Sequence, residues 1–307
     1  MISILLIKKL SELFLIMIMG FSLVKLKILN SKDSRSISII SLYLISPCVI
    51  IHAFQVDYTL EKRNGLILAF IAAIIIHVIL LSLTKILHKF YKLSEVERGS
   101  IIYSNSGNLI IPLVASILGP EWVIYSSAFI SVQLVAMWTH GKMLISSESK
   151  FDIKKIFTNI NFISVIIGMF LFINQIKLPE IIGDTLNSVG STIGPISMII
   201  TGMLIGNVNV ERLLSYKKLH IVTFLKMIFF PSISLLFLKF GGLNTYVTNG
   251  KTVLLITLLA TITPSASTIT QMSQIYGKDA EYAGVISVVT TIVCIITMPI
   301  IVYFYQL

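Results

Sequence analysis

The sequence predicts an all-α polytopic membrane protein, with ten transmembrane helices that form two inverted five-helix repeats. The first observation is composition, because 55% of the 307 residues are hydrophobic and only 12% are charged. A soluble domain carries about 25% charged residues, and with half that share it would expose more apolar surface than water tolerates. The second observation is that apolar runs of about 20 residues recur along the chain, which is the length that crosses a bilayer core of about 30 Å.

These apolar runs give the expected spans, with boundaries accurate to a few residues. The first run is interpreted as a span and not as a signal peptide, because Lys8 and Lys9 follow an apolar start and no cleavage site lies near Gly20. The fourth and ninth runs are the least hydrophobic. The ten spans are 10–25, 37–54, 65–87, 100–118, 122–145, 160–177, 186–206, 219–240, 252–274 and 283–305.

Charge gives the orientation. The net charge is +10, but the basic residues lie in short clusters between apolar runs and not on one face of a soluble domain, so no nucleic-acid partner is expected. Most of the clusters fall in the odd-numbered loops. Because loops rich in Lys and Arg stay in the cytoplasm, both termini are expected outside.

The chain divides at its longest polar connection into a first five-helix repeat at 1–145, a short cytoplasmic linker at 146–159 and a second repeat at 160–307. The two halves are similar in sequence pattern, because Pro47 in the second span corresponds to Pro195 in the seventh. Five is an odd number, so the second half must enter the membrane from the opposite side. An inverted repeat of this kind is typical of secondary transporters.

Two spans carry polar, proline-containing stretches at matching positions of the two halves, and such interrupted helices mark midplane binding sites. Their half-helix N-termini would offer free N–H groups to an anion. The alternative is that the prolines only kink the helices and that Ser and Thr bond to their own turn. The candidate substrate-binding residues are Asn105, Gly107, Asn108 and Pro112 in the fourth span, and Thr263, Pro264, Ser265, Ser267 and Gln271 in the ninth.

Two ionisable residues lie inside spans. Lys226, in the eighth span, would need a partner or water in the membrane, so it either binds the anion or extends to the cytoplasmic surface. His77, in the third span, is a candidate proton-responsive group, against the alternative of a satisfied buried histidine. Gln133 and His140 either line a cavity or bond between helices.

Several chemistries lack their motifs. There is no phosphate-binding loop for an ATPase motor, and no metalloprotease, paired-aspartate or nucleophile motif for an enzyme. Cys48 and Cys294 both lie in apolar runs, without the spacing of a metal site or a disulfide framework. We therefore expect a protein that is not an enzyme and holds no cofactor and no metal.

The polar stretches also carry a family resemblance. The segment Asn105-Ser106-Gly107-Asn108-Leu109-Ile110-Ile111-Pro112, followed by Gly119-Pro120-Glu121, resembles the fourth span of the auxin efflux carrier family. Thr263-Pro264-Ser265-Ala266, followed by the residues from Ile275 to Asp279 and from Thr290 to Pro299, resemble its last two spans. The resemblance covers essentially the whole chain, and the short central loop is similar to that of bacterial members described as malate or malonate permeases.

The resemblance implies a fold like that of bile-acid symporters, in which broken helices 4 and 9 cross near the substrate. It also implies that helices 1, 2, 6 and 7 form a scaffold while the others move as an elevator. The expected activity is transport of a small carboxylate, such as malate, malonate or an auxin-like acid, across the plasma membrane. The alternatives are a ligand sensor of the same fold and an intramembrane enzyme. Besides the substrate and the lipid bilayer, a second copy in a homodimer is a candidate partner.

Overall fold

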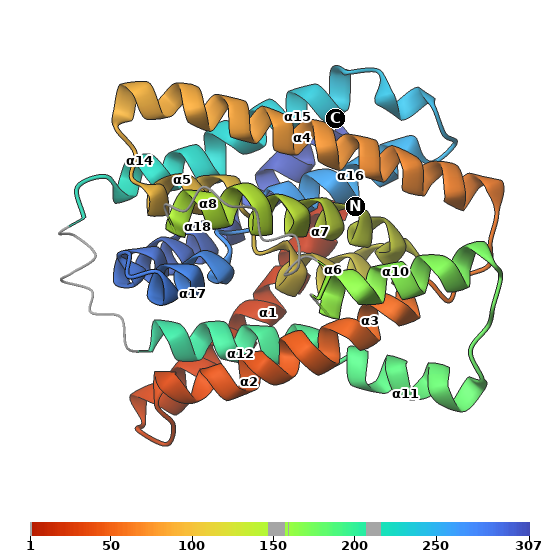
Figure 1. Ribbon diagram of the computed structural model, residues 1–307, viewed down its shortest axis with the longest axis horizontal. Helices are drawn as coiled ribbons and strands as arrows, with labels where there is room; N and C mark the ends of the chain where they lie inside the picture. Colours follow the sequence, from red (N-terminus) through yellow and green to blue (C-terminus); the bar gives the residue numbers. More distant parts are fainter. Residues whose placement is uncertain (1, 147–156, 159, 207–215) are drawn as a thin grey trace.

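The computed structural model describes residues 2–146, 157–158, 160–206 and 216–307, and Figure 1 shows it as a helical bundle. The first half contains α1 (Ile2–Lys25), α2 (Ser34–Ile40), α3 (Ser46–Ala53), α4 (Leu60–Tyr91), α5 (Glu95–Ile102), α6 (Ser106–Ile117), α7 (Val123–Ala136) and α8 (Lys142–Ser146). The second half contains α10 (Ile160–Ile173), α11 (Glu180–Gly190), α12 (Ile193–Ile205), α14 (Leu219–Phe224), α15 (Phe230–Phe240), α16 (Gly250–Thr261), α17 (Ser267–Ile275) and α18 (Ala280–Gln306).

Several of these helices join into longer ones. Wider π-helical turns at Ser41–Ile45, Met137–Gly141 and Leu225–Phe229 connect α2 to α3, α7 to α8 and α14 to α15. Five stretches of the described chain are then long and apolar enough to cross a membrane: Ser31–Ala53, Leu60–Tyr91, Pro120–Ser146, Leu219–Phe240 and Ala280–Gln306. Two shorter apolar helices, Ile160–Ile173 and Gly250–Thr261, pack against these stretches. The predicted all-α, multi-pass membrane class is confirmed.

The helix boundaries differ from the predicted spans where the chain breaks. The fourth span is divided into α5 and α6 by residues 103–105, so the break precedes Pro112, which lies inside α6. The ninth span is divided into α16 and α17 by residues 262–266, and here Pro264 lies in the break itself. The predicted seventh span corresponds to α11 and α12, which begin at Glu180, earlier than predicted. The predicted linker at 146–159 lies almost wholly outside the described residues.

Glycines bring α1 and α12 into backbone contact. A Cβ atom added at Gly202 would lie 1.9 Å from the carbonyl oxygen of Met17, and one at Gly20 would lie 2.3 Å from that of Ile199. No side chain fits at either position unless the helices separate. Small residues at this spacing are typical of helix pairs in membranes, where close packing replaces the hydrophobic effect as the source of stability. The two helices therefore form a tightly packed pair.

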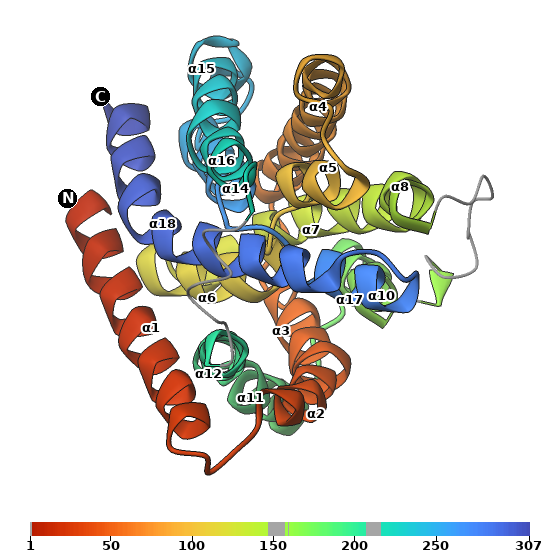
Figure 2. The ribbon, with the colours of Figure 1, turned by 90° about the vertical axis from the view of Figure 1, so that its left-hand side faces the viewer.

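The helices fall into two groups on either side of the interrupted ones. In Figure 2, α1, α2, α3, α11 and α12 lie together on one side, whereas α4, α14 and α15 lie on the other. The interrupted helices α5–α6 and α16–α17 meet between them, with α7 and α18 alongside. The N- and C-termini lie close to one another in both ribbon views. The meeting point of the interrupted helices is thus enclosed by protein.

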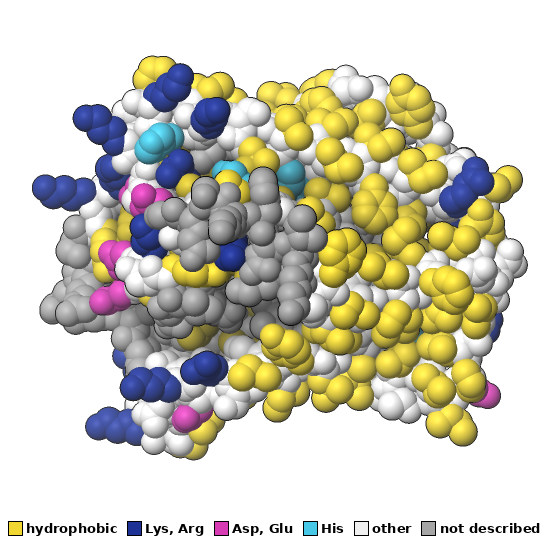
Figure 3. All heavy atoms as spheres, in the orientation of Figure 1, with side chains coloured by type: hydrophobic (Ala, Val, Ile, Leu, Met, Phe, Trp, Pro, Cys, Tyr) yellow, Lys and Arg dark blue, Asp and Glu magenta, His cyan; other side chains and the backbone are white. Residues whose placement is uncertain are grey.

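The surface is divided by polarity. Figure 3 shows that most Lys and Arg side chains on this face gather at one end of the molecule, near α5, α14 and α17, together with acidic residues and histidines. The rest of the face is largely apolar, and large hydrophobic side chains such as Ile71, Phe170 and Ile296 are exposed. An apolar exterior of this extent suits lipid and not water.

Candidate functional site at the crossing of two interrupted helices

The breaks in the two interrupted helices lie against each other. Ser104 and Ser265 form an isolated antiparallel bridge. Beside it, the Asn105 N–H donates to the Pro264 carbonyl oxygen at 2.7 Å, and the Ala266 N–H donates to the Tyr103 carbonyl oxygen at 3.0 Å. In lipid, a broken helix must find partners for its freed backbone groups within the protein. Each break here supplies the partners of the other.

The two breaks arise differently. Pro264 has no N–H and disfavours helical geometry in the residue before it, so α16 ends locally, at Thr261. No proline lies at residues 103–105, where Tyr103 takes an extended conformation with φ −92° and ψ 128°. Its carbonyl oxygen accepts from Ala266. The first break is therefore stabilised by pairing with the second half of the chain.

A buried lysine reaches this crossing. Lys226, on the π-helical turn between α14 and α15, is 2% exposed, and its Nζ donates to the Ser104 Oγ at 2.7 Å. The Ser104 hydroxyl in turn donates to the Thr261 carbonyl oxygen at 2.8 Å. Among the residues that the structure describes, no carboxylate pairs with this ammonium group. The alternative that Lys226 extends to the surface is therefore wrong.

Polar side chains of α7 brace the first break. The Ser104 N–H donates to the Oε1 of Gln133 at 3.0 Å, and the Nε2 of Gln133 donates to the Ser104 carbonyl oxygen at 2.8 Å. The same Nε2 also lies 2.9 Å from the Ser106 Oγ. On the turn that follows α7, the Nδ1 of His140 lies 2.9 Å from the hydroxyl oxygen of Tyr103. Of the two interpretations of Gln133 and His140, bonding between helices is correct.

Hydroxyl groups of α18 brace the second break. The Ser265 N–H donates to the Oγ1 of Thr290 at 3.1 Å, and the Ser287 hydroxyl donates to the Ser265 carbonyl oxygen at 3.3 Å. The Ser265 hydroxyl reaches across to α5, where it donates to the Ser100 carbonyl oxygen at 2.9 Å. Both bridging serines are thus bonded on every side.

Four of the residues that the sequence singled out meet here: Asn105, Pro264, Ser265 and Lys226. Gly107 and Ser267 lie in the first turns of α6 and α17, next to the crossing and half-buried. A Cβ atom added at Gly107 would meet none of the described atoms within 4 Å. There is open space beside the start of α6.

Other predicted site residues lie differently. The Thr263 hydroxyl donates to the Ala260 carbonyl oxygen of its own turn at 2.9 Å, as in the alternative interpretation of such residues. Pro112 lies in the interior of α6, where a Cβ atom on Gly194 of α12 would come 3.0 Å from its Cβ. Asn108 lies in the first turn of α6 and Gln271 lies in the second turn of α17. The side chains of both residues lie outside the described part of the structure.

His77 lies on α4 and is 3% exposed. Its Nδ1 is 2.7 Å from the Ala73 carbonyl oxygen, and because a carbonyl only accepts, the proton is on Nδ1. The ring packs on Phe129, with centroids 4.9 Å apart. Among the described residues, none forms a hydrogen bond with the Nε2 of His77. The Nε2 atom is therefore available to accept a proton or a hydrogen bond.

Sequence reasoning did not assign Ser104, Thr290 and Ser287 to the site. Ser104 is part of the polar stretch in the fourth span, and its position beside Asn105 is the one signal that could have found it. Thr290 and Ser287 lie in an apolar helix with several hydroxyl residues. Nothing in their spacing distinguishes them from residues that bond only to their own turn.

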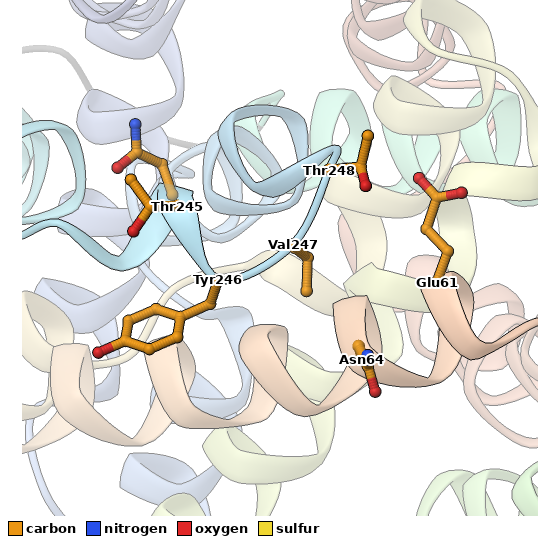
Figure 4. Close-up of a pocket in the computed structure, with 7 residues that line it drawn as sticks. Glu61, Asn64, Thr245, Tyr246, Val247 and Thr248 are labelled. Carbon is orange, nitrogen blue, oxygen red and sulfur yellow. The ribbon is translucent and has the colours of Figure 1, made fainter.

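A hollow in the described surface lies away from this crossing. Its volume is about 710 Å³, and it is lined by Glu61 and Asn64 of α4 and by the connection between α15 and α16, including Tyr246 and Thr248 (Figure 4). A second hollow of about 380 Å³ lies at the start of α5, beside Tyr282. None of the crossing residues lines either hollow.

A multi-pass helical protein with a polar crossing enclosed between two interrupted helices has the architecture of a secondary transporter. The comparisons place it in a family: the model for the family described as "Membrane transport protein" matches residues 5–302. The chain belongs to this family, and the resemblance to the auxin efflux carriers is confirmed. Members of the family are transporters and not enzymes. Among curated proteins, none matches the sequence.

Proposed function

We propose that the protein is a secondary transporter that moves a small organic anion, a carboxylate such as malate, malonate or an auxin-like acid. In this proposal, ten transmembrane helices form two inverted five-helix repeats. The interrupted helices are the fourth and ninth, and their crossing holds the substrate. The observation that carries the proposal is the Lys226 ammonium group, buried at the crossing with a hydroxyl as its partner and no described carboxylate beside it.

Lys226 lacks a counter-charge among the described residues. An ammonium group in the middle of a membrane costs about 2.5–3.5 kcal/mol on insertion scales, and a neutral hydroxyl offsets only part of that cost. A carboxylate bound beside Lys226 would supply the negative charge. The site would then be incomplete without its substrate, which is a reason for the protein to retain a costly side chain at this position.

The first turns of α6 and α17 would provide the remaining contacts. Their free N–H groups and the positive ends of their helix dipoles favour an anion. The open space at Gly107 lies at the first of these turns. We assign the substrate to this space, with Asn105, Asn108 and Ser267 as further polar contacts.

Alternating access would follow from the two groups of helices. The group containing α1, α3 and α12 would be the scaffold, because Gly20 and Gly202 bring two of its members into backbone contact. The group containing α4, α14 and α15 would move past it and carry the crossing, as an elevator. The plasma membrane would hold the protein with both termini outside and the lysine-rich end in the cytoplasm.

Binding is tested first, by thermal shift of the purified protein with malate, malonate, indole-3-acetate and a bile acid. A ligand that binds only the folded protein raises the melting temperature. Uptake of the active compound into proteoliposomes is then compared in the Lys226→Met and Lys239→Met variants. Lys239 is the matched control, because its Nζ donates to the Phe304 carbonyl oxygen at an exposed position.

The expected result is a shift with one class of carboxylate, together with uptake that Lys226→Met abolishes and Lys239→Met retains. Equal uptake by the two variants would remove Lys226 from the site. No shift with any of the anions would contradict the carboxylate assignment. Binding without uptake or counterflow would instead favour the alternative function, a membrane-embedded ligand sensor.

A further inference from the structure

We propose that Gln133 of α7 and the pair Thr290 and Ser287 of α18 are positioning residues for transport. They hold the peptide groups of Ser104 and Ser265, and through them they orient the first turns of α6 and α17 towards the substrate. The inference rests on the proposed function, since it assigns roles around the same crossing. It adds a support on each side of that crossing, one from each half of the chain.

The need for such residues follows from the bridge geometry. The flanking residues of the bridge exchange the hydrogen bonds, so the N–H and C=O groups of Ser104 and Ser265 themselves point outwards. In a water-filled protein these groups would be hydrated. Inside a membrane they must find partners on neighbouring helices. Four outward backbone groups therefore depend on side chains of α7 and α18.

Gln133 satisfies two of these groups with one side chain. Its Oε1 accepts from the Ser104 N–H and its Nε2 donates to the Ser104 carbonyl oxygen, at 3.0 and 2.8 Å. A primary amide can do both because it carries an acceptor and two donors. Gln133 is 7% exposed, so water does not replace it. The Gln133 amide therefore bonds to Ser104 in the way that a neighbouring strand would.

Thr290 and Ser287 share the corresponding work on the other side. The Thr290 Oγ1 accepts from the Ser265 N–H and donates its own proton back to the Ile286 carbonyl oxygen at 2.7 Å. Ser287 donates to the Ser265 carbonyl oxygen. Thr290 is 0% exposed. Two hydroxyl groups here replace the single amide of Gln133, but they bond to the same backbone groups, the N–H and the carbonyl oxygen of the bridging serine.

The three positioning residues act on the proposed substrate site through the N-cap residues of α6 and α17. Asn105 is the N-cap of α6 and Ala266 is the N-cap of α17, and each follows a supported serine. Gln133 also bonds to the Ser106 hydroxyl, the first residue of α6, so it holds both neighbours of the N-cap. In the described structure no comparable bond reaches Ser267. Loss of Gln133 is therefore expected to disturb its half-helix more than loss of Thr290.

The chain offers a matched set of variants on α18. Thr290→Val removes the hydroxyl at constant shape, Thr290→Ser retains it, and Thr291→Val is the control. The Thr291 hydroxyl donates only to the Ser287 carbonyl oxygen of its own helix. On α7, Gln133→Met removes both amide functions at similar size, and Gln133→Glu retains the acceptor alone.

The measurements are the KM and maximal rate of malate uptake in proteoliposomes, the melting temperature, and hydrogen exchange of peptides covering residues 103–109 and 262–268. Thr290→Val should raise the KM for malate about fivefold, the equivalent of one hydrogen bond, with faster exchange at 262–268. Thr290→Ser and Thr291→Val should resemble the unmodified protein. Gln133→Met should raise the KM further, with Gln133→Glu between the two.

A merely structural role predicts something else: a lower melting temperature and maximal rate at unchanged KM, with no recovery in Thr290→Ser. That pattern, or equal exchange at 262–268 in Thr290→Val and Thr291→Val, would overturn the proposal. If the unmodified protein does not transport malate, the proposed function fails for that substrate. The exchange comparison would still decide whether Thr290 holds the crossing, and unchanged exchange would reject it.

Discussion

At the scale of single residues, Lys226 sets the energetics of the site. A buried charge without an ionic partner destabilises a fold, and replacing buried charges by apolar side chains of similar volume is neutral or stabilising by about 1–4 kcal/mol. We therefore expect Lys226→Met to melt at the same temperature as the unmodified protein or higher, although it loses transport. Differential scanning fluorimetry without ligand provides the measurement. A large fall in melting temperature would show that the ammonium group holds the crossing together.

Gly107 permits a second test at this scale. Alanine is favoured over glycine inside a helix by about 0.5–1 kcal/mol, and a Cβ at Gly107 meets nothing within 4 Å. Gly107→Ala should leave the melting temperature unchanged or raised. If the open space is the substrate site, the added methyl group should weaken uptake of the transported anion severalfold.

The control for Gly107 is Gly183→Ala in α11, where an added Cβ also meets nothing within 4 Å. This variant should gain the same stability and keep full uptake. Uptake that is equal in the two variants would show that the space beside Gly107 is not used by the substrate.

At the scale of helices, the pairing of α1 with α12 determines the rigidity of the proposed scaffold. An added methyl at Gly202 would lie 1.9 Å from the Met17 carbonyl oxygen, and backbone cannot yield as a side chain does. Overpacking of this kind costs about 1–3 kcal/mol. Gly202→Ala should therefore lower the melting temperature clearly, whereas Gly183→Ala should not. Equal melting temperatures would mean that α1 and α12 can move apart without loss of stability.

The helix scale also shows how far the sequence could predict the structure. It predicted which two helices are interrupted, and Pro264 located one break correctly because the cause is local. Pro112 did not locate the other, because a helix tolerates proline in its interior. The break at residues 103–105 depends on pairing with residues 264–266, which are distant in the sequence.

The supporting side chains were beyond sequence reasoning for a related reason. Thr290 and Thr291 are adjacent hydroxyl residues on one apolar helix, yet one supports Ser265 and the other bonds only to its own turn. The difference is which side of α18 faces the crossing, and that depends on tertiary packing. Lys226 could be recognised from its charge, but its partner Ser104 could not.

At the scale of the whole molecule, the basic end predicts the orientation in the membrane. Lys89 lies near the end of α4, and Tyr246 lies beside the start of α4, at Glu61. A rise of 1.5 Å per residue places Glu61 and Lys89 roughly 40 Å apart along this helix. Because basic loops stay in the cytoplasm, the two positions should face opposite compartments.

The orientation is measured with single cysteines in a background of Cys48→Ser and Cys294→Ser. In intact cells, a membrane-impermeant thiol reagent should label Tyr246→Cys, whereas Lys89→Cys should react only after permeabilisation. Both positions are exposed, so failure to react reports the compartment and not burial. The reverse pattern would place both termini in the cytoplasm.

The mutual pairing of the two breaks has a consequence for biosynthesis. When the ribosome has delivered only the first half of the chain, the Tyr103 carbonyl and the Asn105 N–H lack these partners, because Ala266 and Pro264 are not yet made. In lipid each unpaired group costs several kcal/mol. In the nascent first half, residues 103–105 must therefore either continue the helix without a break or lie at the membrane–water interface until translation is almost complete. A chain truncated before Pro264 would present quality-control proteases with a membrane segment that cannot complete its fold.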